Sequence, residues 1–174
     1  MTGLRQGELL GLKWADVDLE RAVLEVRRSL SVVDNKPVLK DWTKTDAGRA
    51  VQMHPIAAEA VQRHRTRQLE ERLRYASLWK DNDLVFPSRT GGPMHRQNLA
   101  RRSFKPLLRR AGLPDVRFYD LRHTFATLMF KQDAKPKVVQ EMLGHASIKT
   151  TLDTYTHVIP GMQKEAVERL GELF

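Results

Sequence analysis

Five side chains stand out because together they could carry out chemistry on an anion. Three are cations, one is an imidazole and one is a phenol: Arg5, Lys44, Arg122, His145 and Tyr155. A tyrosine, with a pKa of about 10, is a weak nucleophile unless a positively charged pocket stabilises its oxygen. Taken singly, each residue also fits an ordinary role on the surface, at a helix end or half buried. The surrounding sequence must therefore show whether these residues have a functional or an ordinary structural role.

Three strings contain four of these residues. They are TGLRQGELLGLKWADVD at residues 2–18, DLRHTFAT at 120–127 and LGHASIKTTLDTYTH at 143–157. In this order and spacing they resemble the catalytic domain of the tyrosine recombinase (phage integrase) family. The Lys44-Thr45 turn followed by Arg49 is similar to that family's lysine-bearing β-hairpin. The resemblance extends from Thr2 to about Pro160.

The resemblance implies a nucleophile and the groups that stabilise its target phosphate. Tyr155 would attack a DNA phosphodiester, form a covalent 3′-phosphotyrosyl link and release a 5′ hydroxyl. Arg5 and Arg122 would bind the non-bridging oxygens of that phosphate. Guanidinium suits this role because its planar donors pair with phosphate and stay charged. His145 would donate a further hydrogen bond to the phosphate.

The resemblance also supplies a general acid and an acidic helper. Lys44 would protonate the departing 5′ oxygen from a hairpin that closes on bound DNA, with Arg49 and Lys40 as rivals nearby. Lys44 is preferred because it alone stands in a Lys-Thr setting. Glu8, three residues after Arg5, would either orient a catalytic cation or form an exposed surface pair, and the sequence favours neither.

One position departs from the family pattern. The second string usually begins with histidine three residues before its arginine, and here that place is Tyr119. Tyr119 and Arg122 share a helical face near a helix N-terminus, where a phenol can donate a hydrogen bond to phosphate. A phenol cannot carry protons near neutral pH as imidazole can. His123 is expected to point away from Arg122 and give structural support, and the role of His157 is left open.

The elements that must position these residues form an α+β fold that is mainly helical. Alternating patterns separated by turn residues predict a three-stranded antiparallel sheet near the N-terminus, from residues 22–33, 38–42 and 49–53, with Lys44 at the rim of the second hairpin. Helices are expected over residues 55–74, 95–111, 120–132, 136–143 and from a Ser147 cap to Tyr155. Gly144 suits a helix C-terminus. An amphipathic tail helix is expected over residues 161–174.

The composition excludes several classes of protein. The chain has 174 residues, enough for one domain with a real core, and no cysteine, which rules out disulfides and thiolate zinc sites. No apolar run approaches the roughly 20 residues that span a bilayer, and no secretion signal is visible, so we expect a protein of the bacterial cytoplasm without membrane contact. P-loop, EF-hand and HExxH motifs are absent, so no metal or other cofactor is expected.

The net charge of +9 indicates a polyanionic partner. Residues 1–87 carry 15 basic and 13 acidic side chains, whereas residues 88–174 carry 15 and 8, a net charge of +7. In the second half, five basic residues are expected to contact DNA: Arg96, Arg101, Arg102, Lys105 and Arg109. The alternative is a solvated helix face.

Together these features predict a site-specific recombinase or integrase that acts on double-stranded DNA. The alternatives are a chain that only binds DNA and a type IB topoisomerase-like enzyme that nicks and reseals it. Because the first string begins at Thr2, we expect residues 1–174 to be an N-terminally incomplete catalytic domain without the family's core-binding domain. Family members act as tetramers that exchange C-terminal segments, which the tail at 161–174 permits, and a monomer is the alternative for the isolated chain.

Overall fold

The N-terminal segment forms a short helix that places Arg5 and Glu8. In the computed structural model, which describes residues 2–41, 48–155 and 168, helix α1 spans Gln6–Gly11. The carboxylate of Glu8 accepts a hydrogen bond from the backbone N–H of Arg5 at 2.8 Å, which satisfies one of the free donors at the start of the helix. A 3-10 turn, Trp14–Asp16, and the short strand β1, Val17–Asp18, follow.

The predicted small antiparallel sheet near the N-terminus and its first hairpin are confirmed, but the last strand pairs with a different partner. The segment 22–33 divides into β2, Val23–Val26, and β3, Arg28–Val33. Strand β3 forms a hairpin with β4, Lys36–Asp41, through a turn in which Asp34 and Asn35 have φ of 47° and 58°. Positive φ at both central residues is the geometry that favours a two-residue hairpin.

The last strand, β5, Arg49–Gln52, pairs with β2 and not with β4. The three-stranded sheet therefore has the order β1-β2-β5, and the predicted pairing of residues 38–42 with 49–53 is wrong. Leu24 lies opposite Val51 in this register, and both side chains are buried. Alternation in a sequence predicts which residues are extended, whereas the partner of each strand depends on the buried face it shares. Lys44, which precedes β5 in the sequence and was predicted at the rim of a hairpin, lies outside the described residues.

The helices follow the predicted bounds closely, with one exception. Helix α2 spans Pro55–Tyr75, and α5, α6 and α7 span Asp120–Lys131, Pro136–Leu143 and Ile148–Tyr155. Gly144 ends α6 with a φ of 65°, as predicted, and the Ser147 hydroxyl accepts a hydrogen bond from the N–H of Lys149. The predicted helix 95–111 consists of α3, Arg96–Asn98, a π-helical turn, Leu99–Phe104, and α4, Lys105–Arg110.

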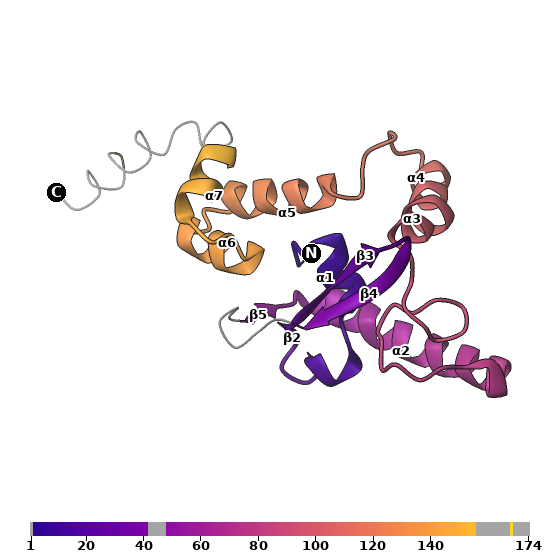
Figure 1. Cartoon of the computed structure of the whole chain (residues 1–174). Coiled ribbons are helices and arrows are strands. Elements are labelled where there is room, and N and C mark those ends of the chain that lie inside the picture. The colour runs from indigo at the N-terminus through magenta and orange to yellow at the C-terminus, as the bar shows by residue number, and fades with distance from the viewer. Residues whose placement is uncertain (1, 42–47, 156–167, 169–174) are drawn as a thin grey trace.

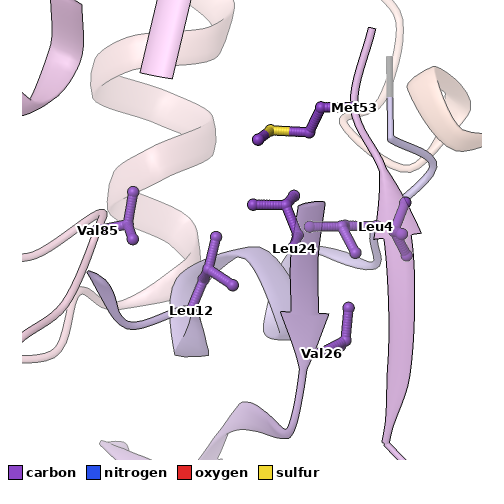
Figure 2. Close-up of a cluster of buried hydrophobic side chains, with 7 residues drawn as sticks. Leu4, Leu12, Leu24, Val26, Met53 and Val85 are labelled. Carbon is purple, nitrogen blue, oxygen red and sulfur yellow. The ribbon is translucent and has the colours of Figure 1, made fainter. Parts of the chain in front are cut away.

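Two hydrophobic clusters hold these elements. The first joins α1 to the sheet and is shown in Figure 2; its buried members are Leu4, Leu12, Leu24, Val26, Val51, Met53 and Val85. The second lies among α5, α6 and α7, with Ala126, Phe130, Val139, Leu143 and Tyr155. Helix α5 runs between the α3–α4 pair and the α6–α7 pair (Figure 1). Within the described ranges, no helix is long and apolar enough to cross a membrane.

Candidate active site

Arg122 joins the N-terminal segment to the end of α6. Its guanidinium donates from Nη1 to the carbonyl oxygen of Gly3 at 2.6 Å and from Nη2 to that of Leu143 at 2.7 Å. The residue is 2% exposed, and burial together with the charge of Arg5 lowers its pKa to about 10, so it remains charged at neutral pH. In the described part of the chain, its Nε is the one buried side-chain donor or acceptor that lacks a hydrogen-bond partner.

Glu8 lies between two arginines. It accepts a hydrogen bond from Nη1 of Arg5 at 2.8 Å and two from Arg49, from Nη1 at 3.0 Å and Nη2 at 2.7 Å. Burial would raise the pKa of this carboxyl, but the hydrogen bonds and charges of Arg49 and Arg5 outweigh it and the pKa is lowered. With Glu8 2% exposed, the contact with Arg5 is no ordinary surface pair, and the orienting role is the one its geometry favours.

Arg49, which the sequence suggested only as a rival of Lys44, contacts the same cluster of side chains. Besides its two bonds to Glu8, it donates from Nε to the carbonyl oxygen of Met142 at 2.9 Å. A Cβ at Gly144 would lie 2.6 Å from its Nη1, so this glycine leaves the space that the guanidinium fills. Arg49 thus ties β5 to α1 and to the end of α6.

His145 follows this turn and is held by α7. Its Nδ1 lies 2.8 Å from the hydroxyl of Thr151, which is fully buried, and its carbonyl oxygen accepts a hydrogen bond from the side chain of Gln140. Burial and the positive charge of Arg122, followed by that of Arg5, lower the pKa of His145 to about 4. The imidazole is therefore neutral at neutral pH.

Tyr155, the last residue of α7, points into the second hydrophobic cluster. It is 3% exposed, its ring lies 5.8 Å from that of Phe130, and burial raises the pKa of its hydroxyl. Its Oη lies 2.9 Å from Nδ1 of His123. His123 was predicted to give structural support and to point away from Arg122. Its direct contact with Tyr155 depends on how α7 packs on α5, which no local pattern encodes.

Tyr119 lies at the start of α5 and is the most open of the aromatic groups here. It is 47% exposed, and its ring meets that of His123 edge to face, with centroids 4.9 Å apart. Its carbonyl oxygen accepts a hydrogen bond from the N–H of Arg122 at 3.0 Å. The substitution of histidine by tyrosine in the family pattern therefore places a second phenol against His123.

The five basic residues predicted to contact DNA lie on α3, the π-helical turn and α4, at the other end of α5 from α6 and α7 (Figure 1). The four arginines are exposed: Arg96, Arg101, Arg102 and Arg109. Lys105 instead pairs with Asp115 and donates to the carbonyl oxygen of Val116 at 3.0 Å. Arg96 adjoins α1: its carbonyl oxygen accepts a hydrogen bond from Nε2 of Gln6 at 3.1 Å, and a Cβ at Gly7 would lie 2.7 Å from its Nη2.

The low pKa of His145 predicts a loss of stability in mild acid. In the unfolded chain this histidine takes up a proton near pH 6.5, whereas in the folded chain it does so near pH 4. Between these values the unfolded state binds more protons, so the free energy of unfolding falls as the pH falls, by about 1–3 kcal/mol. Glu8, with its lowered pKa, loses its contribution only at lower pH.

Urea unfolding of the chain and of His145→Asn at several pH values between 4 and 7 measures this effect. The variant cannot titrate at this position, so its free energy of unfolding should depend less steeply on pH in that window. Parallel pH dependences for the two proteins would contradict the assignment.

Comparison with known proteins identifies the family and the fold. The model of the phage integrase family matches residues 1–161. A tyrosine recombinase XerC-like protein of Caldanaerobacter subterraneus subsp. tengcongensis is 39% identical over 99% of this chain and 47% of its own length. The ICEBs1 integrase of Bacillus subtilis is 29% identical over 99% of this chain and 46% of its own. The chain thus spans about half the length of these relatives.

Solved structures share the fold. A Tn1549 transposon integrase in complex with circular intermediate DNA is 25% identical and has a TM-score of 0.75, covering 97% of this chain and 56% of that one. The XerA recombinase is 31% identical with a TM-score of 0.68, covering 97% and 53%. A post-cleavage complex of the XerH recombinase with difH DNA is 31% identical with a TM-score of 0.63, covering 95% and 42%. By its family model, its relatives and its fold, the chain belongs to the phage integrase family of tyrosine recombinases.

Proposed function

We propose that this chain is the catalytic part of a site-specific recombinase or integrase that cleaves and rejoins DNA through a covalent 3′-phosphotyrosyl intermediate. The observation that carries the proposal is that Arg5 and Arg122 bind backbone carbonyl groups of segments far apart in the sequence and so lie in one cluster. Arg122 on α5 binds the carbonyl oxygens of Gly3 and Leu143, and Arg5 binds that of Gly144 at 3.0 Å. Fixed positive charge next to a buried tyrosine hydroxyl suits phosphoryl transfer.

Two arginines have hydrogen-bond donors that remain available for a phosphate. Nε of Arg122 is a buried donor without a partner, and the side chain of Arg5 is 41% exposed although one of its nitrogens binds Glu8. A phosphate oxygen would satisfy the unpaired donor, whose burial is otherwise unfavourable. Arg5 and Arg122 therefore bind the non-bridging oxygens in this scheme, and Glu8 orients Arg5.

His145 and Tyr119 supply neutral donors. If the Thr151 hydroxyl donates to Nδ1 of His145, the imidazole proton lies on Nε2, from which it can be donated to a phosphate oxygen. The exposed hydroxyl of Tyr119 offers a second hydrogen bond at the start of α5. Neither group needs to ionise for this role.

Lys44 is the proposed general acid for the departing 5′ oxygen. The contacts of its rival Arg49 support this choice. All three donor nitrogens of Arg49 already bind Glu8 or Met142, so Arg49 acts as a structural cation. Lys40 lies on β4 and is exposed.

Double-stranded DNA is the proposed partner, and the Tn1549 integrase and XerH structures, both complexes with DNA, support this choice. The exposed arginines of α3, the π-helical turn and α4 would bind the phosphate backbone, a contribution that weakens steeply with salt. We propose a tetramer on DNA that exchanges the segment 161–174, of which the structure describes residue 168 alone, with a monomer as the alternative for the free chain.

A pool of nicked duplexes with randomised sequence around the nick tests the function without knowledge of the target site. Cleavage close to the nick releases a short fragment, so rejoining fails and the covalent complex accumulates. The proposal predicts DNA that stays attached in SDS and whose recovered sequences share a motif. A salt-sensitive mobility shift without attachment would favour DNA binding alone. Relaxation of supercoiled DNA without a shared motif would favour the topoisomerase-like alternative.

Cleavage is also expected to survive removal of divalent ions. The phosphotyrosyl bond conserves the energy of the broken phosphodiester, and the charge on the phosphate is met by guanidinium groups, so the proposed chemistry has no step for a metal ion. The yield of SDS-resistant complex should be equal with and without EDTA. Loss of the complex in EDTA and its return with Mg²⁺ would count against the scheme.

A further inference from the structure

The hydroxyl of Tyr155 is held by a side chain that the proposed roles leave unused. Nδ1 of His123 lies 2.9 Å from Oη of Tyr155, and the two rings are tilted by 55° with centroids 5.8 Å apart. His123 lies near the start of α5 and Tyr155 ends α7, so the packing of these helices creates the contact. An imidazole nitrogen at hydrogen-bond distance from a nucleophilic hydroxyl is the arrangement of a general base.

A base is needed because Tyr155 does not ionise readily. Burial raises the pKa of its hydroxyl, so the phenolate is scarce at neutral pH. The phenol must therefore lose its proton as its oxygen attacks phosphorus. A proton acceptor that already forms a hydrogen bond with the hydroxyl can accept the proton without any rearrangement.

The other groups of the site are poorly suited to this task. Tyr119 is a phenol, which does not take up a proton near neutral pH. Nδ1 of His145 is already bound to a threonine hydroxyl, and burial and nearby arginines lower the pKa of this imidazole to about 4. The carboxylate of Glu8 is occupied by two guanidinium groups.

We propose that His123 accepts the proton of Tyr155 during DNA cleavage, an assignment that rests on the proposed function. As Oη bonds to phosphorus, its proton passes to Nδ1 of neutral His123, whose own proton lies on Nε2. The bond between phosphorus and the 5′ oxygen breaks, and that oxygen takes a proton from the general acid. In rejoining, the 5′ hydroxyl attacks phosphorus and returns its proton to the deprotonated general acid, the Oη–phosphorus bond breaks, and His123 returns its proton to Tyr155.

The surroundings of His123 fit a base that becomes charged. The ionisable groups that interact with it are Tyr119 at the N-cap of α5, Asp120 on α5, His145 before α7 and Tyr155. Asp120, whose carboxylate also binds Arg117, carries the negative charge of this set and favours the imidazolium. The ring of Tyr119 covers the imidazole edge to face and limits its rotation.

The variant His123→Asn separates proton transfer from positioning. Asparagine keeps a polar atom near the position of Nδ1 and can hold the Tyr155 hydroxyl, but it cannot accept its proton. With DNA captured from the randomised pool, single-turnover cleavage at neutral pH should be about 100-fold slower, with DNA affinity unchanged. His54→Asn, which replaces an exposed histidine at the α2 N-cap with another good capping residue, should match the unmodified chain.

The pH profile and a modified substrate give readouts that a structural role would not change. The cleavage rate of the unmodified chain should reach a plateau on the alkaline side, because the base is then fully available, whereas the rate of His123→Asn should keep rising with pH. Replacing the scissile 5′ oxygen by sulfur removes the need for a general acid. This substrate should restore a Lys44→Ala variant but leave His123→Asn slow, because His123 acts on the nucleophile.

The outcomes distinguish this inference from the function it rests on. Wild-type rate and pH profile in His123→Asn, with Tyr155 still forming the adduct, would overturn the role of His123 alone. Absence of an adduct in the unmodified chain would overturn the proposed function. If thermal unfolding shows that His123→Asn does not fold, His123→Gln and the pH profile of the unmodified chain test the role of His123 instead. A pH profile without a plateau would then contradict the assignment.

Discussion

Replacement of Tyr155 by phenylalanine is expected to abolish the SDS-resistant DNA complex, a loss of more than about a thousandfold, as for other enzymes that lose their nucleophile. DNA affinity should be retained, because the Tyr155 ring is 3% exposed and phenylalanine preserves its packing against Phe130. Removing the hydroxyl leaves Nδ1 of His123 without its partner, at a cost of about 1 kcal/mol in stability. Denaturing gels measure the complex, and mobility shifts measure the affinity.

The matched control is Tyr119→Phe, which removes a hydroxyl from the second phenol next to His123. Tyr119 is 47% exposed and is proposed only to donate a hydrogen bond, so cleavage should fall by about tenfold at most, the value of one neutral hydrogen bond. An equal loss of the complex in both variants would contradict the division of roles between these two tyrosines.

The second large effect is expected at Glu8. The substitution Glu8→Gln retains the shape of the side chain but removes the negative charge that Arg5 and Arg49 share, leaving their charges uncompensated beside a carboxamide that is 2% exposed. Breaking a buried ion pair in this way costs about 3–5 kcal/mol, a large part of the stability of a domain. Urea unfolding at neutral pH measures the loss, and cleavage should fall with it because Arg5 loses its support.

An exposed pair of the same chemistry provides the control for Glu8. Glu59 contacts Arg63 on α2 at 2.5 Å, with the two side chains 66% and 59% exposed. Glu59→Gln should change the free energy of unfolding by less than about 1 kcal/mol, since water screens such pairs. A loss of that small size for Glu8→Gln as well would show that the buried carboxylate does not hold the two arginines.

Local signals in the sequence predicted most of the elements and several site residues. Pro55 at the first turn of α2, Ser147 before α7 and Gly144 after α6 each act on the backbone within a few residues, so the helix bounds follow from them. The α+β class and the small antiparallel sheet also agree with the structure. The three strings brought Arg122 and His145 into the same candidate site before any contact was known.

What the sequence could not supply depends on packing between segments far apart in the chain. Arg49 binds Glu8, 41 residues away, and His123 meets Tyr155 across 32 residues. The helical face of His123 was assigned correctly as different from that of Arg122. The position of α7, which brings Tyr155 against that face, was not predicted. In the same way, β5 was recognised as a strand while its partner, β2, was set by the buried contact of Leu24 and Val51.

Mass spectrometry of the covalent complex tests the central claim most directly. Trypsin should release residues 150–164 from the complex, a peptide in which Tyr155 is the one tyrosine. After nuclease digestion of the DNA, fragmentation of this peptide should place a nucleotide on Tyr155, attached through its 3′ phosphate. A nucleotide on any other residue of the chain, or SDS-resistant DNA with an unmodified peptide 150–164, would contradict the assignment of Tyr155 as the nucleophile.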